Sequence, residues 1–333
     1  MSPLVHSSLW TSPFKHLHSQ KKLLLLKLST TTTTTTTERY DESKPSRPLP
    51  PPIRVSLTES AGRGVFATRR IGTGELIHTA KPIVSHPSLS SIHGTCYFCL
   101  KRLGNKTSSL AEGVSFCSQE CREQYKDYYE VEKMADWSSY NDYCRAQGLK
   151  YPLLVKRLAC MVISGVASAD DLDILQPAIL SPEMTFMIEK EFCLLKSVFN
   201  NALITGEKTA FLTEQWYNGV LARIRINAFR IELVGGMYED LLSAASASVE
   251  AEAAVGNAVY MLPSFYNHDC DPNVHIIWIE NVDARLKALR DIEAGEELRI
   301  CYIDASMDHG ARQTILSEGF GFQCRCPRCL SGD

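Results

Sequence analysis

Grouped cysteines constrain the fold of this chain more than any other feature of its sequence. Seven of the twelve cysteines fall into two tight groups: Cys96, Cys99, Cys117 and Cys121 in one, and Cys324, Cys326 and Cys329 in the other. Paired cysteines at this spacing suit tetrahedral zinc, with each sulfur about 2.3 Å from the metal. Three thiolates are one short of a closed structural site, so the second group needs a fourth ligand from elsewhere in the chain.

The overall composition is that of a globular protein. Of the 333 residues, 44% are hydrophobic and 22% are charged. A small secreted disulfide protein would be shorter and carry a signal peptide, and no apolar run of about 18 residues is present to span a membrane. Four further cysteines lie in apolar or aromatic sequence and are expected to be buried free thiols: Cys144, Cys160, Cys193 and Cys301.

Residues 1–50 are expected to be a disordered low-complexity tail or a transit peptide that ends in a proline-rich linker. Residues 1–37 contain four lysines, many hydroxyl side chains and no acidic residue, and Thr30 to Thr37 is an unbroken threonine run. An acid-free, hydroxyl-rich start is typical of an organellar transit peptide, and the late first arginine, Arg39, fits a plastid somewhat better than a mitochondrion. A tail without any address explains the same composition equally well.

Charge is unevenly distributed along the chain. The net charge is −3, but residues 38–333 carry 31 basic and 38 acidic side chains. An acidic body lacks the basic surface expected of a direct nucleic-acid binder. It favours a protein substrate, and no membrane partner is expected.

Hydrophobic periodicity predicts an α+β fold with a large insertion. Alternation indicates strands near residues 53–57, 65–68 and 76–77, and again near 229–233, 274–279, 285–289 and 298–303. Between the two sets lie the first cysteine group and a stretch, 120–222, with helical spacing. The order of strands, cysteines, helices and strands favours one interrupted β-rich domain over two consecutive domains.

Four motifs carry a resemblance to a known family. Residues 267–273, NHDCDPN, resemble the N-H-S-C-x-P-N motif of SET domains, and residues 293–302, EAGEELRICY, resemble their G-E-E-L-x-x-x-Y ending. Residues 62–67, GRGVFA, resemble the opening G-x-G, and residues 321–329, GFQCRCPRC, resemble the post-SET cysteine cluster. With the insertion after the first strands, the chain is similar to the SET-and-MYND lysine methyltransferases.

The resemblance implies a domain plan and two zinc sites. A SET domain with a knot-like crossing would span 51–304, interrupted by a partial MYND-like zinc finger at 94–125 and a helical insertion at 126–225, with a post-SET segment at 305–333. Residues 116–121, FCSQEC, resemble the later cysteine pair of MYND fingers, but the second interleaved pair is missing, so one zinc is expected there. In the family, the cysteine at position 270 completes the C-terminal zinc with Cys324, Cys326 and Cys329.

The resemblance also implies a reaction and its residues. S-adenosyl-L-methionine would donate a methyl group to a protein lysine, with Tyr302 as the catalytic residue. The residues implied in cofactor binding are Gly62, Arg63, Gly64, Asn227, Asn267, His268, Tyr302 and Phe322. Asp269 departs from the usual serine. A simple turn is the alternative for residues 62–64, and a buried capping side chain is the alternative for Asn227.

Substrate and location are implied only by the family. A histone is the default substrate and the nucleus the default location, while a plastid or mitochondrial address would point to another protein. The alternative function is a catalytically idle SET scaffold that uses its zinc module to bind proteins.

Overall fold

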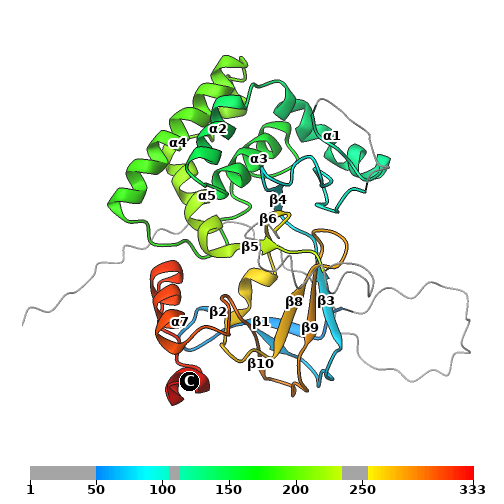
Figure 1. Cartoon of the computed structure of the whole chain (residues 1–333), viewed down its shortest axis with the longest axis vertical. Coiled ribbons are helices and arrows are strands. Elements are labelled where there is room, and N and C mark those ends of the chain that lie inside the picture. Colours follow the sequence, from blue (N-terminus) through cyan, green and yellow to red (C-terminus); the bar gives the residue numbers. More distant parts are fainter. Residues whose placement is uncertain (1–49, 105–112, 235–253) are drawn as a thin grey trace, which may run out of the picture. The chain divides into compact units, whose positions relative to one another are not determined.

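The computed structural model describes residues 50–104, 113–234 and 254–333. Within these residues the chain combines helices and small sheets, which confirms the predicted α+β class (Figure 1). All but the last residue of the tail predicted at 1–50 lies outside the described residues. No helix in the described part has the length and apolar character needed to cross a membrane.

The first sheet joins the two ends of the β-rich region. Its strand order is β1 (Ile53–Leu57), β2 (Arg63–Ala67), β10 (Glu297–Ile300) and β7 (Asn267–His268). β1, β2 and β10 pair antiparallel, whereas β10 and β7 pair parallel, with Arg299 opposite Asn267. The sheet therefore places the opening glycine motif, the NHDC motif and the strand that leads to Tyr302 side by side.

Two three-stranded antiparallel sheets complete the β-rich part. One has the order β3 (Leu76–Ala80), β9 (Ala284–Ala288) and β8 (Val274–Ile277). The other has the order β4, β6 and β5, which are given by Val84–Pro87, Gly256–Val259 and Ala228–Ile231. The apolar sides of the sheets share one core of residues such as Val65, Tyr260 and Leu286.

In the described part of the insertion between β4 and β5, the α-helices are α1 (Gln119–Lys133), α2 (Ser138–Ala146), α3 (Tyr151–Ser164), α4 (Pro182–Asn201) and α5 (Glu214–Asn227). Their i, i+3 and i+4 apolar residues face a second core, in which α3 is buried along most of its length. Figure 1 shows the ribbon of α3 among the other helices of the insertion. Side chains of Ser118, Ser181 and Thr213 cap α1, α4 and α5 and fix where each helix begins.

The C-terminal segment folds into three short helical pieces. They are α7 (His309–Ile315), a π-helical turn at Leu316–Phe320 and α8 (Pro327–Ser331). Asp308 caps α7, and Pro327 occupies the first turn of α8, where its missing N–H costs no hydrogen bond. These pieces enclose a third, small core made of cysteines and aromatic rings.

Candidate active site and metal centres

The first cysteine group converges on one point. The Sγ atoms of Cys99 and Cys117 are 3.5 Å apart, as are those of Cys117 and Cys121, and all four Sγ atoms, including that of Cys96, lie within 4.8 Å of one another. Ser118 accepts a hydrogen bond from the N–H of Cys121, so the cap of α1 sets the position of this ligand.

The segment that carries the first cysteine group, called the finger, packs against both the sheets and the helices. Leu100, in a left-handed conformation at φ 60°, is fully buried in the core of the sheets. The carbonyl of Cys99 accepts a hydrogen bond from the N–H of Val282 at 2.7 Å, and the Tyr97 hydroxyl reaches the buried carboxylate of Glu132 on α1 at 2.6 Å. The finger thus contributes to both larger cores.

The second cysteine group gains its fourth member, Cys270, from the segment that follows β7. Cys270 lies two residues beyond His268, and its Sγ is 3.6 Å from that of Cys329 and 4.0 Å from that of Cys324. Cys326 is the N-cap residue of α8 and Cys329 lies in its first turn, so the helix brings both to one side. The four Sγ atoms lie within 4.8 Å of one another, and all four residues are buried.

Both groups fit a tetrahedral metal ion. Ligands about 2.3 Å from a central zinc are separated by about 3.8 Å, close to the sulfur distances found here. All twelve cysteines are free thiols, so the close approach does not come from disulfides. Cys144 and Cys160 are buried, as expected for free thiols, but Cys193 is exposed because it lies on the solvent side of α4, and Cys301 is only half-buried. The expectation of burial was therefore wrong for Cys193.

Asn267 occupies the point where β2, β7 and β10 meet. Its amide nitrogen donates to the carbonyl of Arg63 at 3.2 Å and to Oε1 of Glu297 at 2.8 Å. Gly64 makes this approach possible, because a Cβ there would lie 2.6 Å from Glu297 Oε1 and 3.1 Å from Asn267 Nδ2. The Asn267 side chain and Gly64 therefore both belong to this junction of β2, β7 and β10, which is the strand crossing.

Asp269, which replaces the usual serine, forms an ion pair with Arg299. Arg299 on β10 lies 3.5 Å from the Asp269 carboxylate and 2.5 Å from Oε2 of Glu297. The same Glu297 accepts from Asn267 through its other oxygen. Arg299 thus offsets the extra negative charge at position 269 and orients Glu297.

His268 links the strand crossing to the second cysteine group. Its Nδ1 accepts a hydrogen bond from the main-chain N–H of Tyr302 at 3.1 Å, so the ring proton lies on Nε2, which faces the sulfur of Cys270 at 3.3 Å. Burial lowers the pKa of His268 to about 4, so the imidazole is neutral.

The Tyr302 side chain is enclosed by aromatic rings. Its ring centroid lies 5.2 Å from that of His268, 5.1 Å from Phe320 and 6.4 Å from Phe322. The hydroxyl donates to the main-chain carbonyl of Tyr266 at 2.6 Å. Burial raises the pKa of Tyr302, so the phenol remains protonated at neutral pH.

Tyr266 is a member of this cluster that the sequence analysis missed. It is fully buried, and its hydroxyl lies 3.0 Å from Nε2 of His78 on β3. Burial lowers the pKa of His78 to about 4 and raises that of Tyr266, so a neutral imidazole and a neutral phenol share this hydrogen bond. The only available signal was its place directly before the NHDC motif.

The remaining predicted cofactor residues lie near a segment of the helical insertion. The Arg63 guanidinium donates to the carbonyl of Ile174 and stacks 4.7 Å from the ring of Phe265. The amide nitrogen of Asn227 donates to the carbonyls of Gln176 and Arg223 at 2.8 and 2.7 Å. Gly62 has φ +72° and open space around the position of a Cβ.

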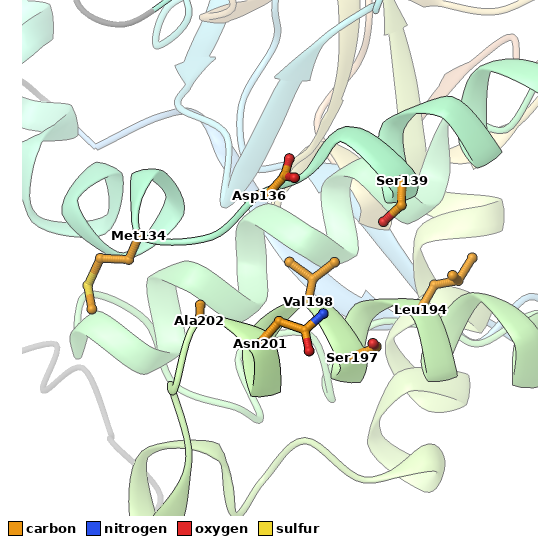
Figure 2. Close-up of a pocket in the computed structure, with 8 residues that line it drawn as sticks. All are labelled: Met134, Asp136, Ser139, Leu194, Ser197, Val198, Asn201 and Ala202. Atoms are coloured by element: carbon orange, nitrogen blue, oxygen red, sulfur yellow. The ribbon is translucent and has the colours of Figure 1, made fainter.

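A separate hollow of about 290 Å³ lies within the helical insertion. The end of α1, the start of α2 and the last turns of α4 line it with side chains such as Asp136, Ser139 and Asn201 (Figure 2). None of the predicted site residues lines this hollow.

Comparison with known proteins gives one consistent family. The SET domain matches residues 62–303. A histone-lysine N-methyltransferase, ATXR4, of Arabidopsis thaliana is 65% identical over 285 residues, which cover 85% of this chain and 88% of the relative. A SET and MYND domain-containing protein of Dictyostelium discoideum is 26% identical over 77% of each chain.

One solved structure, the SET domain of LSMT bound to lysine and AdoHcy, has 13% sequence identity and a TM-score of 0.35, covering 82% of this chain and 53% of that chain. The family assignment rests on the sequence matches, because the SET domain covers residues 62–303 and the Arabidopsis relative is 65% identical over 85% of this chain. They confirm the resemblance seen in the motifs: the chain belongs to the SET-domain family.

Proposed function

We propose that this protein transfers a methyl group from S-adenosyl-L-methionine to the side-chain amine of a protein lysine. The observation that carries the proposal is the enclosed phenol of Tyr302, held between Tyr266 and the NHDC motif beside the parallel strands β7 and β10. Asn267, His268 and Phe322 would hold the donor beside it, together with Gly62, Arg63 and Gly64. The domain plan of 51–304, with insertions at 94–125 and 126–225 and a segment at 305–333, is part of the same proposal.

The chemistry suits an aromatic, desolvated site. The donor supplies an electrophilic methyl group on sulfur, and a lysine amine with an ordinary pKa of about 10.4 cannot attack while it is protonated. Aromatic, desolvated surroundings disfavour the ammonium form and so favour the neutral amine. No nucleophilic side chain is needed, and catalysis depends on positioning and electrostatics.

Tyr302 would act through its oxygen. The Tyr302 hydroxyl is protonated at neutral pH and donates its hydrogen to the Tyr266 carbonyl, so it cannot take a proton from the lysine. Its oxygen still has lone pairs that can accept a hydrogen bond from an N–H of the attacking amine. This orients the amine toward the methyl group. Asn227 would act less directly, because its amide is used by the main chain of the insertion.

Two zinc ions would stabilise the structure without taking part in the reaction. Four thiolates fill each site, which leaves no open position for a water or substrate. The C-terminal site would hold the segment that carries Phe320 and Phe322 against Tyr302. The eight ligands would be Cys96, Cys99, Cys117, Cys121, Cys270, Cys324, Cys326 and Cys329.

Substrate and location are the finer parts of the proposal. A histone is the substrate we propose first, because the Arabidopsis relative is named a histone-lysine N-methyltransferase, and the nucleus is the corresponding location. The acid-free residues 1–37 support a plastid or mitochondrial protein as the alternative. A fluorescent fusion of residues 1–50 discriminates the two, since an organellar signal would exclude a solely nuclear location.

The test uses the purified full chain with labelled S-adenosyl-L-methionine and two substrate pools, core histones and an organellar extract. Label on lysine supports methyl transfer, and the pool that accepts it gives the substrate class. Calorimetry with the unlabelled donor is run in parallel. Absence of both donor binding and label would reject the proposal.

One observation supports a second candidate function, an idle scaffold. Arg63 and Asn227 are both engaged by the insertion, at Ile174 and Gln176, rather than facing an open site. A scaffold would show no heat of donor binding. The embedded finger argues against it, because Leu100 and Tyr97 are used in the cores and are not presented to a partner.

A further inference from the structure

Arg312 is a fully buried cation beside the second cysteine group. It lies on α7 with no exposed surface, and its Nη2 is 4.0 Å from the sulfur of Cys329. Nη1 donates to the carbonyl of Met307 at 2.6 Å, and Nη2 also donates to a main-chain oxygen of Asp333. Nε has no hydrogen-bond partner. Among the described residues, no carboxylate side chain lies within ion-pair distance of Arg312; the acidic side chain of Asp333 interacts with it electrostatically but is largely exposed to solvent.

Such a charge needs compensation. A buried guanidinium loses its hydration, and an acidic neighbour that is exposed to solvent, such as Asp333, compensates that loss only weakly because water screens its charge. Four thiolates around one zinc ion carry a net charge of −2, and attraction between this charge and a guanidinium is strong away from water. The two unfavourable buried charges would therefore stabilise each other.

We infer that Arg312 is the counter-charge of the C-terminal metal cluster and a positioning residue for its ligand Cys329. This inference rests on the metal part of the proposed function. It assigns α7 a role that its sequence does not reveal, since position 312 lies outside every cysteine motif.

The next residue of α7 supports the inference independently. The Gln313 side chain donates to the carbonyl of Cys324 at 2.8 Å and accepts from the N–H of Cys324 at 3.0 Å. Two consecutive residues of one helix thus reach the cluster, one through charge and the other through the main chain of a ligand. Partners in this outer layer typically change metal affinity by about 10- to 100-fold when removed.

The experiment compares the wild-type full chain with Arg312→Gln, Arg312→Lys and Arg325→Gln. Arg325 lies between two ligands and is exposed, so it controls for loss of one positive charge in the same segment. Zinc content is measured by elemental analysis, and zinc release is followed with a chromogenic chelator. Alkylation with N-ethylmaleimide and mass spectrometry assigns each release phase to residues 96–121 or 324–329.

The expected result is zinc release from the C-terminal site that is about 10- to 100-fold faster in Arg312→Gln, with early alkylation of Cys324, Cys326 and Cys329 and an unchanged finger. Arg312→Lys keeps the charge and should release zinc more slowly than Arg312→Gln. Arg325→Gln should match the wild type. Wild-type release from Arg312→Gln, or equal acceleration by Arg325→Gln, overturns the inference.

A second measurement applies if Arg312→Gln does not fold. Hydrogen exchange of the wild type, before and after chelation, should show that α7 loses protection together with the metal; unchanged protection of α7 overturns the inference. The proposed reaction is tested separately. If the wild type methylates lysine but binds no zinc at the C-terminal site, the inference about Arg312 is wrong and the proposed reaction stands. If it binds zinc there but does not methylate lysine, the proposed reaction is wrong and the inference about Arg312 stands.

Discussion

At the scale of single residues, Tyr302 is held from three sides. Its main-chain N–H is bonded to His268, its hydroxyl to the carbonyl of Tyr266, and its ring faces Phe320. Only the hydroxyl bond depends on the phenol oxygen. The ring and main chain should therefore keep their places when that oxygen is removed, so its chemical role can be separated from its structural one.

Tyr302→Phe should lower methyl transfer by about 100-fold, the usual effect of removing one oriented polar group from an active site. The free energy of unfolding should change by only about 1 kcal/mol, because one hydrogen bond is lost. Turnover with labelled donor and thermal unfolding are measured together. Tyr143→Phe, on α2, is the control and should retain full turnover. Undiminished turnover in Tyr302→Phe contradicts the assigned role.

Gly64→Ala tests how closely the strands approach at the crossing. The added Cβ would lie 2.6 Å from Glu297 Oε1 and 2.8 Å from Thr58 Cγ2, so we expect a loss of about 1–3 kcal/mol of stability from crowding. Gly72→Ala is the matched control, because no atom lies within 4 Å of its Cβ position. It should change stability by less than about 1 kcal/mol. Equal urea midpoints for the two variants would exclude close packing at Gly64.

At the scale of elements, a buried ion pair joins α1, the helix that carries Cys121, to α3. Lys156 Nζ lies 2.7 Å from Glu132 Oε1, and both side chains are almost fully buried. Glu132 also accepts from the hydroxyls of Tyr97 and Tyr125. Arg157 bonds the carbonyls of Ser85 on β4 and Tyr97 in the finger at 2.6 and 3.0 Å. These contacts fix α1, α3, β4 and the finger to one another.

Lys156→Met should destabilise the protein by about 3–5 kcal/mol, because it leaves the Glu132 carboxylate buried without its cation. Lys126→Met, on the exposed side of α1, should have little effect. Urea unfolding of both variants provides the comparison. Similar unfolding midpoints would show that the pair adds little to stability.

The same carboxylate should give the protein an acid-dependent stability. Burial alone would raise the pKa of Glu132, but the charges of Lys156 and Arg157 outweigh it and hold the pKa well below its usual value. The contribution is therefore complete above the unfolded pKa of about 4.3 and is lost as the pH falls below it. Between about pH 5 and 3, Glu132→Gln should lose less stability than the wild type; an identical slope would contradict this.

The sequence predicted elements with clear periodicity and missed those without it. β1, with alternating Ile53, Val55 and Leu57, was predicted at its actual bounds, and the stretch of helical spacing predicted at 120–222 covers nearly all of α1 to α5. β4 and β6 are four residues long and buried at every position, so no alternation marks them. Cys270 was placed with the second group by the family motif alone. Tyr266 and Arg312 belong to no motif, and only the folded chain brings them to the site.

At the scale of the whole molecule, the finger joins the two larger cores. Leu100 lies in the core of the sheets, whereas Cys96, Tyr97 and Phe116 lie in the core of the helices. A MYND-type module that served only for docking would unfold independently of the rest. Because these side chains are shared, we expect the finger metal, the sheets and the helices to unfold as one cooperative unit.

Cys117→Ala should therefore lower the unfolding temperature of the entire body in a single transition, with zinc content reduced by one equivalent. Cys193→Ala is the control, because Cys193 is exposed and outside both cysteine groups. Methyl transfer should fall in proportion to the loss of folded protein. β4 contacts α3 and pairs with β6, so unfolding of the finger and helices should also destabilise the sheets. A separate early transition in calorimetry, with methyl transfer unchanged after it, would instead make the finger an independent module whose surface is free for a partner.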